Sequence, residues 1–333
     1  PDCSNMCHEA SGYAMKQAIG VGKGTVTLED FDHADAIFVF GQNPGTNHPR
    51  MLHTLSHAAQ RGANIVTFNT LKERGLERFA NPQSPAHMVL GGETKLTSQY
   101  FTPNLGGDMA AVRGMVKVLL KRHNQALENG DRVFNVKFIE QHTSGLKAYL
   151  AQVDATPWSD ITAQSGLSKK QIKSAADVYQ QSKRVIFTWA MGITQHKHSV
   201  PTINEMTNLQ LLFGNIGKKG AGLCPVRGHS NVQGDRTMGI DEKPNAVLLD
   251  NIEKTFNFKP PAEHGHNAVQ AVEAMLRGDS KVFIGLGGNF VAAMPDSEIT
   301  RQAMSRCDLT VNIATKLNRT HLYPGKTALI LPC

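Results

Sequence analysis

Two neighbouring residues near the start of the chain, Cys7 and His8, place a thiol beside an imidazole. A thiolate binds transition metals, and a neutral imidazole gains or loses its proton close to physiological pH. The pair therefore predicts a metal ligand with a proton acceptor next to it. The alternative is that Cys7 acts as a small buried hydrophobic residue beside a histidine with internal hydrogen bonds.

A second chemical feature lies more than two hundred residues downstream, in the stretch CPVRGHSNVQGDRTMG at residues 224–239. Arg227 stands there between Val226 and Gly228, where a fixed guanidinium could bind a carboxylate through two hydrogen bonds. The preceding glycine-rich run from Gly214 exposes backbone N–H groups that suit anions, and Lys218 is the next anion partner. So many glycines predict neither a stable helix nor a central strand for residues 214–234.

Composition limits the class of protein. A chain of 333 residues with 40% hydrophobic content predicts two α/β lobes. The net charge of +7 is not gathered in a long basic run and aromatic content is 6%, which argues against nucleic acid and leaves a polyanionic cofactor as the partner. No apolar run reaches membrane-spanning length. The five irregularly spaced cysteines indicate a reducing, cytoplasmic location, and Cys3 and Cys7 have no second pair for structural zinc.

Apolar runs and helical periodicity predict the elements that position these residues. A βαβ unit is expected from a strand at residues 35–41, a helix at 49–60 and a strand at 64–68. Further predicted elements are helices at 108–125, 168–181, 202–213 and 267–277, and strands at 184–189, 281–286, 308–314 and 327–332. Residues 91–107 and the stretch from 239 to 266 are expected to be irregular. The fold class is therefore α/β, with mainly parallel sheets flanked by helices.

Five of these strands end in polar or glycine-rich segments. Ligands of parallel sheets gather beyond the carboxyl ends of the strands, so five such endings predict one extended, phosphate-bearing ligand. The candidates are Asn43, Asn47, His48, Asn69, Gly192, Gln195, Asn289 and Thr315. For any one of them, capping a helix or forming a turn is the competing interpretation.

The strings GQNPGTNHPRM at residues 41–51 and VRGHSNVQG at 226–234 carry a family resemblance. The chain resembles the molybdopterin oxidoreductases of the formate dehydrogenase and dimethyl sulfoxide reductase superfamily, within the formate dehydrogenase-like group. The resemblance covers essentially the whole chain but only the middle of such an enzyme. It implies two Rossmann-like domains, a molybdopterin dinucleotide-binding domain at 1–229 and a partial second dinucleotide-binding domain at 230–333.

The resemblance also implies roles for individual residues. Cys7 matches the molybdenum ligand, His8 the adjacent proton-handling histidine, and Arg227 the arginine that holds formate. The implied cofactor contacts are Gly41, Asn43, His48, Asn69, Gly192, Gln195, Gly214, Asn215, Lys218, Gly228, Asn231, Gln233, Asn289 and Thr315. Two departures concern the guanine contact and the substrate, since Asn69 stands where an aspartate is common and Glu9 where a small residue is common.

The function implied by the resemblance is two-electron oxidation of formate or a similar small anion at a molybdenum bis(molybdopterin guanine dinucleotide) centre. The electron acceptor is unknown, an iron–sulfur cluster would lie outside this chain, and the isolated stretch is expected to bind no cofactor. One alternative is a catalytically divergent member that acts in stress tolerance or binds a cofactor or partner. The other, a nicotinamide-dependent dehydrogenase, lacks G-x-G-x-x-G after the first strand. The leading hypothesis requires Cys7 and Arg227 to meet at one crevice.

Overall fold

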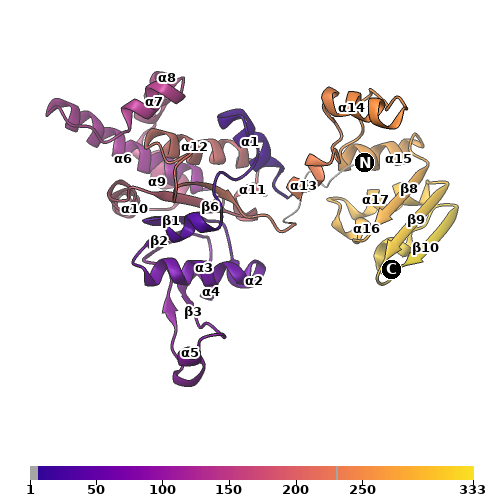
Figure 1. The fold of residues 1–333 in the computed structure, drawn as a ribbon, viewed down its shortest axis with the longest axis horizontal. Helices are drawn as coiled ribbons and strands as arrows, with labels where there is room; N and C mark the ends of the chain where they lie inside the picture. Colours follow the sequence, from indigo (N-terminus) through magenta and orange to yellow (C-terminus); the bar gives the residue numbers. More distant parts are fainter. Residues whose placement is uncertain (1–6, 230–231) are drawn as a thin grey trace. The chain divides into compact units, whose positions relative to one another are not determined.

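The computed structural model describes residues 7–229 and 232–333, apart from the side chains of residues 86, 87, 90, 233, 236 and 237. It divides the chain between residues 230 and 231 into two compact units (Figure 1). Each unit is built on its own parallel sheet, so the predicted α/β class is confirmed.

The first unit contains a five-stranded sheet in the order β5-β2-β1-β6-β7, and every neighbouring pair of strands is parallel. Its strands are β1 (Ala36–Phe40), β2 (Asn64–Phe68), β5 (Gln99–Phe101), β6 (Val185–Trp189) and β7 (Gly222–Pro225). All residues of the two central strands β1 and β6 are buried. Burial on both faces explains why these strands are continuous apolar runs in the sequence.

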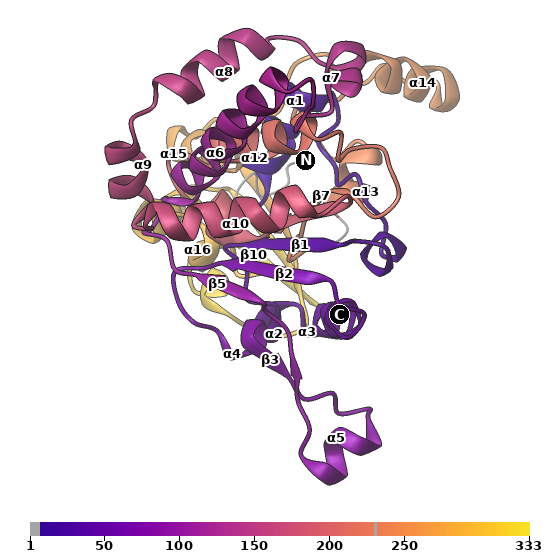
Figure 2. The same ribbon diagram turned by 90° about the vertical axis from the view of Figure 1, so that its left-hand side faces the viewer.

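Side chains of β1 alternate between two hydrophobic cores. Phe38 and Phe40 pack into the larger core, with residues of the helices α1 (Glu9–Ile19), α6 (Asp108–Glu128), α10 (Lys169–Gln181) and α12 (Ser199–Leu212). Ile37 and Val39 pack into the smaller core, against α3 (Pro49–Gln60). Figure 2 shows these helical layers on the two sides of the sheet. The first unit is therefore a three-layer α/β sandwich.

Shorter elements complete the first unit. They are η1 (Glu29–Asp32), α2 (Pro44–Asn47), α4 (Arg74–Glu77), α5 (Pro85–Leu90), α7 (Val136–His142), α8 (Leu146–Ala155), α9 (Trp158–Ser165) and α11 (Met191–Thr194), with the antiparallel pair β3 (Arg78–Phe79) and β4 (Thr94–Lys95). The β3–α5–β4 arm extends away from the sheet in Figure 1. Among the described residues, no helix has both the length and the apolar character needed to cross a membrane.

Several predicted boundaries agree closely with the structure. The helix at 49–60 is α3, and α10 begins after Ser168, whose side chain accepts a hydrogen bond from the Gln171 backbone in a capping box. Four strands among the described residues, β3, β4, β5 and β7, were not predicted. β4 and β5 interrupt the expected loop at 91–107, and two or three residues are too few to show a period. β7 lies within the glycine-rich run, where an edge strand tolerates glycine more readily than a central one.

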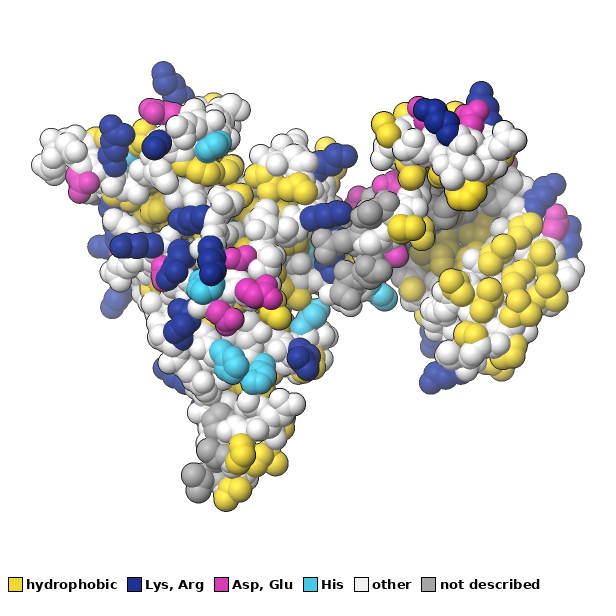
Figure 3. Space-filling view, viewed as in Figure 1, with side chains coloured by type: hydrophobic (Ala, Val, Ile, Leu, Met, Phe, Trp, Pro, Cys, Tyr) yellow, Lys and Arg dark blue, Asp and Glu magenta, His cyan; other side chains and the backbone are white. Residues whose placement is uncertain are grey.

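The second unit has a parallel sheet in the order β10-β9-β8, made of β8 (Val282–Leu286), β9 (Leu309–Ala314) and β10 (Thr327–Pro332). Its helices are α13 (Val232–Thr237), α14 (Ala246–Phe256), α15 (Ala268–Arg277), α16 (Phe290–Ala293), α17 (Ser297–Ser305) and η2 (Arg319–Leu322). One face of this sheet stays exposed, with Ile284 at 67% and Leu286 at 82% exposure. Figure 3 shows apolar side chains gathered over these strands.

The prediction of an irregular stretch from 239 to 266 was wrong, because α14 lies within it. The helix has apolar residues at helical spacing but buries none of them, and the prolines on either side, Pro244 and Pro260, favour an irregular segment. Its stabilisation is local. The Asn245 side chain accepts a hydrogen bond from the Leu248 backbone at 2.8 Å, and Asn257 ends the helix in a left-handed conformation.

A buried carboxyl group gives the first unit a predicted pH dependence. Asp108 at the start of α6 is 5% exposed, and burial raises its pKa from 3.8 to about 7. The folded protein thus favours the protonated form, and stability is lost as pH rises from about 4 to 7. At pH 8, Asp108→Asn should raise the free energy of unfolding by at least about 1.4 kcal/mol, which is the free energy equivalent of a pKa change of about one. Urea unfolding at pH 5 and 8 tests this, and equal gains at both pH values would contradict it.

Candidate functional site

The site lies at the carboxyl edge of the first sheet, where the segments after β1, β6 and β7 meet. The Gly192 N–H after β6 donates to the Gly41 carbonyl after β1 at 3.0 Å. The Val226 N–H after β7 donates to the carbonyl of Trp189, the last residue of β6, at 2.8 Å. These bonds continue the sheet's pairing beyond its strands, so the three segments form one continuous rim.

Cys7 is fixed to this rim through its backbone. Its carbonyl accepts hydrogen bonds from Thr194 Oγ1 at 2.8 Å and Gln195 Nε2 at 3.0 Å, both from the segment after β6. The Cys7 thiol is free and partly exposed. The structure thus holds the first described residue at the sheet edge while leaving its sulfur available to a ligand.

His8 is 3% exposed and stands at the N-terminus of α1. Its Nδ1 lies 2.9 Å from Ser11 Oγ, which also accepts a hydrogen bond from the indole N–H of Trp189 at 2.9 Å. A hydroxyl has one proton and two acceptor sites, so Ser11 either donates to His8 Nδ1 or accepts from it, according to the tautomer of the ring. His8 Nε2 is buried and makes no hydrogen bond of normal geometry with the described residues.

The pKa of His8 is lowered from 6.5 to about 4, so the ring is neutral at pH 7. Burial is the largest cause, and the positive charge of Arg227 is the second. The nearby backbone of Val226 acts in the opposite direction, and His48 lowers the pKa further. These interactions bring His8, His48 and Arg227 into one electrostatic cluster, although they are far apart in sequence.

Arg227 is held at both its side chain and its backbone. Its Nη2 donates to the Gly22 carbonyl at 3.0 Å, and its own carbonyl accepts from His48 Nε2 at 3.1 Å. Because a carbonyl only accepts, His48 donates to it through Nε2. The other ring nitrogen, Nδ1, is buried without a partner among the described residues.

Gly41 and Gly192 are both at the rim, and their backbones touch. A Cβ on Gly41, whose φ is 51°, would stand 2.8 Å from the Gly192 backbone, and one on Gly192 would stand 2.6 Å from Gly41 Cα. Only glycine fits such a contact. Asn43 precedes α2 at the same edge, and Asn69 follows β2, where its Nδ2 donates to the Leu71 carbonyl at 2.9 Å. Gly228 directly follows Arg227 and is exposed.

Three predicted cofactor contacts, Gly214, Asn215 and Lys218, are not brought to this edge. Lys218 Nζ donates to the carbonyl of Lys183, which precedes β6, so it lies at the amino edge of the sheet. Asn215 is buried and donates to the Tyr179 hydroxyl at 3.1 Å. The sequence predicts one ligand loop at residues 214–234, but β7 divides that stretch. Because a strand begins at one edge of the sheet and ends at the other, the residues before β7 and those after it lie at opposite edges.

The remaining predicted contacts lie elsewhere. Asn289 precedes α16 after β8, and its Oδ1 accepts from Thr320 Oγ1 at 3.2 Å. Thr315 follows β9 and is exposed. Both therefore stand at the carboxyl edge of the second unit's own sheet. Asn231 and the Gln233 side chain lie outside the described residues.

Sequence reasoning missed the residues that support the site: Ser11, Gly22, Trp189 and Thr194. Ser11 and Trp189 connect α1 to β6, and Thr194 binds the Cys7 carbonyl. Ser11 could have been found, since a hydroxyl three residues after His8 on a helix shares its face. The other contacts depend on tertiary structure.

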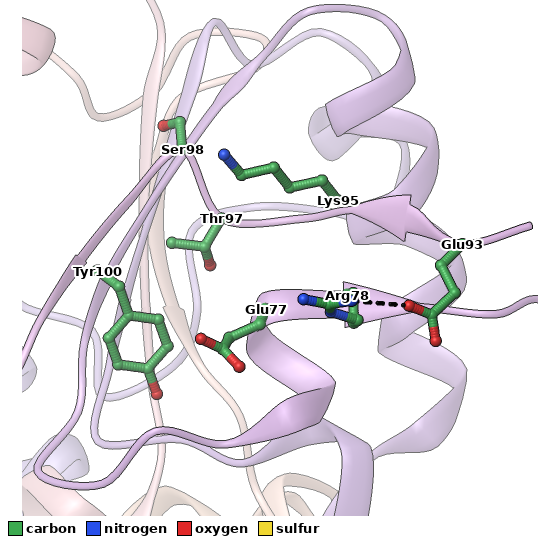
Figure 4. A pocket seen from close by; sticks show the side chains of 7 residues that line it. All are labelled: Glu77, Arg78, Glu93, Lys95, Thr97, Ser98 and Tyr100. Carbon is green, nitrogen blue, oxygen red and sulfur yellow. Dashed lines mark hydrogen bonds and ion pairs between the residues drawn. The ribbon is translucent and has the colours of Figure 1, made fainter.

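The described residues contain no cluster of three or more His, Cys, Asp or Glu side chains suited to a metal. A cavity of about 480 Å³ lies apart from Cys7, and Figure 4 shows its lining: Glu77, Arg78, Glu93, Lys95, Thr97, Ser98 and Tyr100. Its charges largely pair with one another, since Glu93 binds Arg78 at 3.3 Å and Arg74 at 2.7 Å. This cavity is thus separate from the residues that carry the chemistry, and we assign the candidate site to those residues.

Comparison with known proteins gives a consistent result. The sequence model of the family described as "Molybdopterin oxidoreductase" matches residues 2–323. Protein YdeP of Escherichia coli K12 is 47% identical over 333 residues, which is 100% of this chain and 44% of that protein. Formate dehydrogenase H of the same strain is 27% identical over 237 residues, or 71% of this chain and 29% of that protein. The chain therefore spans less than half the length of these relatives.

Among solved structures, acetylene hydratase from Pelobacter acetylenicus resembles the chain with a TM-score of 0.65 and 15% identity. The match covers 92% of this chain and 41% of that one. At this identity the likeness concerns the fold alone.

The contact between Gly41 and Gly192 predicts a steric effect on stability. Gly192→Ala should lower the free energy of unfolding by about 1–3 kcal/mol, because its Cβ would overlap the Gly41 backbone. Gly228→Ala is the matched control. A Cβ there meets no atom within 4 Å, so a change of about 0.5 kcal/mol or less is expected. Urea unfolding of both variants measures the difference, and equal losses would show that the contact relaxes freely.

Proposed function

We propose that the chain forms the catalytic middle part of a molybdenum-dependent oxidoreductase that acts on formate or a similar small anion. The premise is that the chain belongs to the molybdopterin oxidoreductase family. The observation that carries the proposal is the meeting of Cys7–His8 with Arg227 at one sheet edge. Formate dehydrogenase H among its relatives supports a small carboxylate as substrate. Oxidation of formate yields carbon dioxide, one proton and two electrons.

The residues present fit a molybdenum–pterin group. Cys7 offers one soft sulfur ligand, and the described residues contain no cluster of three further ligands, so a metal here must bring its other ligands with it. His8 Nε2 and His48 Nδ1 are buried polar atoms without partners among the described residues, as expected beside a polar group. When bound, the molybdenum–pterin group supplies the two-electron acceptor.

We assign to Arg227 the binding of the anion. A guanidinium has five N–H donors, so Arg227 can hold the Gly22 carbonyl and still bind a carboxylate. His48 fixes its backbone from the opposite side. The positive charge beside a buried, neutral imidazole favours an anion over a neutral substrate of the same size.

His8 is the proposed proton-handling group. It is neutral at pH 7 and presents Nε2 on the side of Val226 and Arg227. In the tautomer whose Nδ1–H donates to Ser11, Nε2 has the lone pair that would take up a proton released by the substrate, while Ser11 and Trp189 fix the ring. The side chain is buried, so proton transfer is shielded from bulk water.

The form of the cofactor and the route of the electrons extend the proposal. We propose bis(molybdopterin guanine dinucleotide), with Gly41, Asn43, His48, Gly192, Gln195 and Gly228 as contacts at the first sheet edge and Asn289 and Thr315 at the second. Both sets stand at carboxyl edges of parallel sheets, where dinucleotides bind. The electron acceptor, and any iron–sulfur cluster that passes electrons to it, would lie outside this chain.

A catalytically divergent relative is the second candidate function. Glu9, which follows His8, is an exposed acidic residue in the first turn of α1, next to a site proposed to bind an anion. Its negative charge opposes anion binding. Under this alternative the protein binds the cofactor or a partner, or acts in stress tolerance, without oxidising formate.

Elemental analysis of the complete protein, together with formate turnover using an artificial electron acceptor, tests the proposal. We expect molybdenum or tungsten in the wild-type protein and formate-dependent reduction of the acceptor. Arg227→Ala should keep its metal and lose about 10- to 100-fold in kcat/KM for formate, because a charged hydrogen bond to the anion is removed.

The exposed Arg132→Ala serves as a control for the loss of one positive charge and should behave as wild type. A loaded protein that does not oxidise formate would favour the divergent alternative. Full turnover by Arg227→Ala would remove the anion-binding role of that residue.

A further inference from the structure

The glycine-rich segment Gly20–Thr27 has a place in the structure that its sequence does not suggest. It lacks the Ser or Thr that follows Gly-Lys in a phosphate-binding loop, since Lys23 is followed by Gly24. Instead it runs beside β7, the edge strand of the sheet. The Thr25 N–H donates to the Leu223 carbonyl at 2.9 Å, and Thr25 Oγ1 accepts from the Leu223 N–H at 2.9 Å. The segment is thereby fixed to the strand that leads into Arg227.

Within this segment, Gly22 touches both Arg227 and α1. Its carbonyl accepts a hydrogen bond from Arg227 Nη2 at 3.0 Å. Its Cα rests against Gly12 in the first half of α1, so that a Cβ on Gly22 would stand 2.8 Å from the Gly12 carbonyl oxygen and 3.1 Å from its Cα. Since neither partner has a side chain, the two backbones approach more closely than any other residue pair would allow. The position of the Gly22 carbonyl is therefore set by α1, the helix that begins after His8.

We propose that the Gly22 carbonyl is a positioning group that orients the Arg227 guanidinium for binding a small carboxylate. This inference rests on the proposed function of Arg227. An arginine side chain loses rotamer freedom when it binds a ligand, and a hydrogen bond already present in the free protein removes part of that cost. The bond also determines where the other N–H groups of the guanidinium lie, because the group is planar and rigid. Moving the carbonyl should thus weaken anion binding without touching the reacting atoms.

The test compares two alanine substitutions in the same segment. Gly22→Ala forces its Cβ against the backbone of Gly12, which cannot yield as a side chain would. Gly24→Ala is the matched control, because its Cβ would make ordinary contacts with the Leu223 carbonyl at 3.4 Å and Pro225 Cδ at 3.6 Å. Neither glycine has a positive φ, so backbone strain does not separate them.

In the complete protein loaded with its cofactor, Gly22→Ala should raise KM for formate by about tenfold, while kcat and molybdenum content change by less than about twofold. Gly24→Ala should match wild type in all three. The formate concentration that half-saturates the rise in melting temperature should shift as KM does, which gives a readout independent of turnover. An unchanged KM in a folded Gly22→Ala protein would overturn the positioning role.

A double-mutant cycle shows whether the effect passes through Arg227. In an Arg227→Ala background, Gly22→Ala should change KM for formate by less than about twofold, because the group that it positions is gone. An equal rise in both backgrounds would mean that Gly22 acts on the site by another route, and would overturn the inference. If Gly22→Ala does not fold, Thr25→Val replaces it. That change removes the acceptor for the Leu223 N–H, and an unaltered KM would count against the role.

The proposed function and the positioning role of Gly22 can be refuted separately. If the loaded wild-type protein neither binds nor oxidises formate, the proposed function is refuted, and the positioning role with it. If the wild-type protein oxidises formate and Gly22→Ala behaves as wild type, only the positioning role is refuted.

Discussion

The direction of five parallel strands is the constraint on which the site depends. All five run the same way, so the segments that follow β1, β6 and β7 must emerge at one edge of the sheet. Cys7, His48 and Arg227 meet there although they come from distant parts of the chain. The same constraint sends the connection from α12 to β7, which contains Lys218, to the opposite edge. Strand direction, more than residue type, decides which polar loops can share a ligand.

Helix α1 connects the two chemical groups through adjacent residues. Ser11 binds the His8 imidazole and the Trp189 indole, and Gly12 supports Gly22, whose carbonyl binds Arg227. Consecutive positions on a helix point in directions about 100° apart, so one turn can support two different neighbours. The imidazole and the guanidinium are thereby positioned by the same rigid element. Their separation is fixed locally, even though the chain between them is more than two hundred residues long.

Much of the fold could be predicted from the sequence, because buried parallel strands are continuous apolar runs and amphipathic helices have a clear helical period. The bounds of α3, and the capping of α10 by Ser168, follow from such signals. The strands that were missed have weak signals: β7 is glycine-rich and at an edge, and β5 has only three residues. In the site, Cys7, His8 and Arg227 could be proposed from residue types and resemblance. Gly22 and Trp189 could not, because a backbone carbonyl or an indole N–H gives no sequence signal until tertiary contacts are known.

The two histidines make the interior of the site polar. The Arg227 carbonyl can only accept, so His48 donates to it through Nε2. The Ser11 hydroxyl, which accepts from the Trp189 indole, also binds His8 Nδ1. The two remaining ring nitrogens, His8 Nε2 and His48 Nδ1, are buried without partners among the described residues, and leaving such atoms unpaired is costly. An apolar molecule cannot pair with them, whereas a polar group that carries oxygen atoms and N–H donors can.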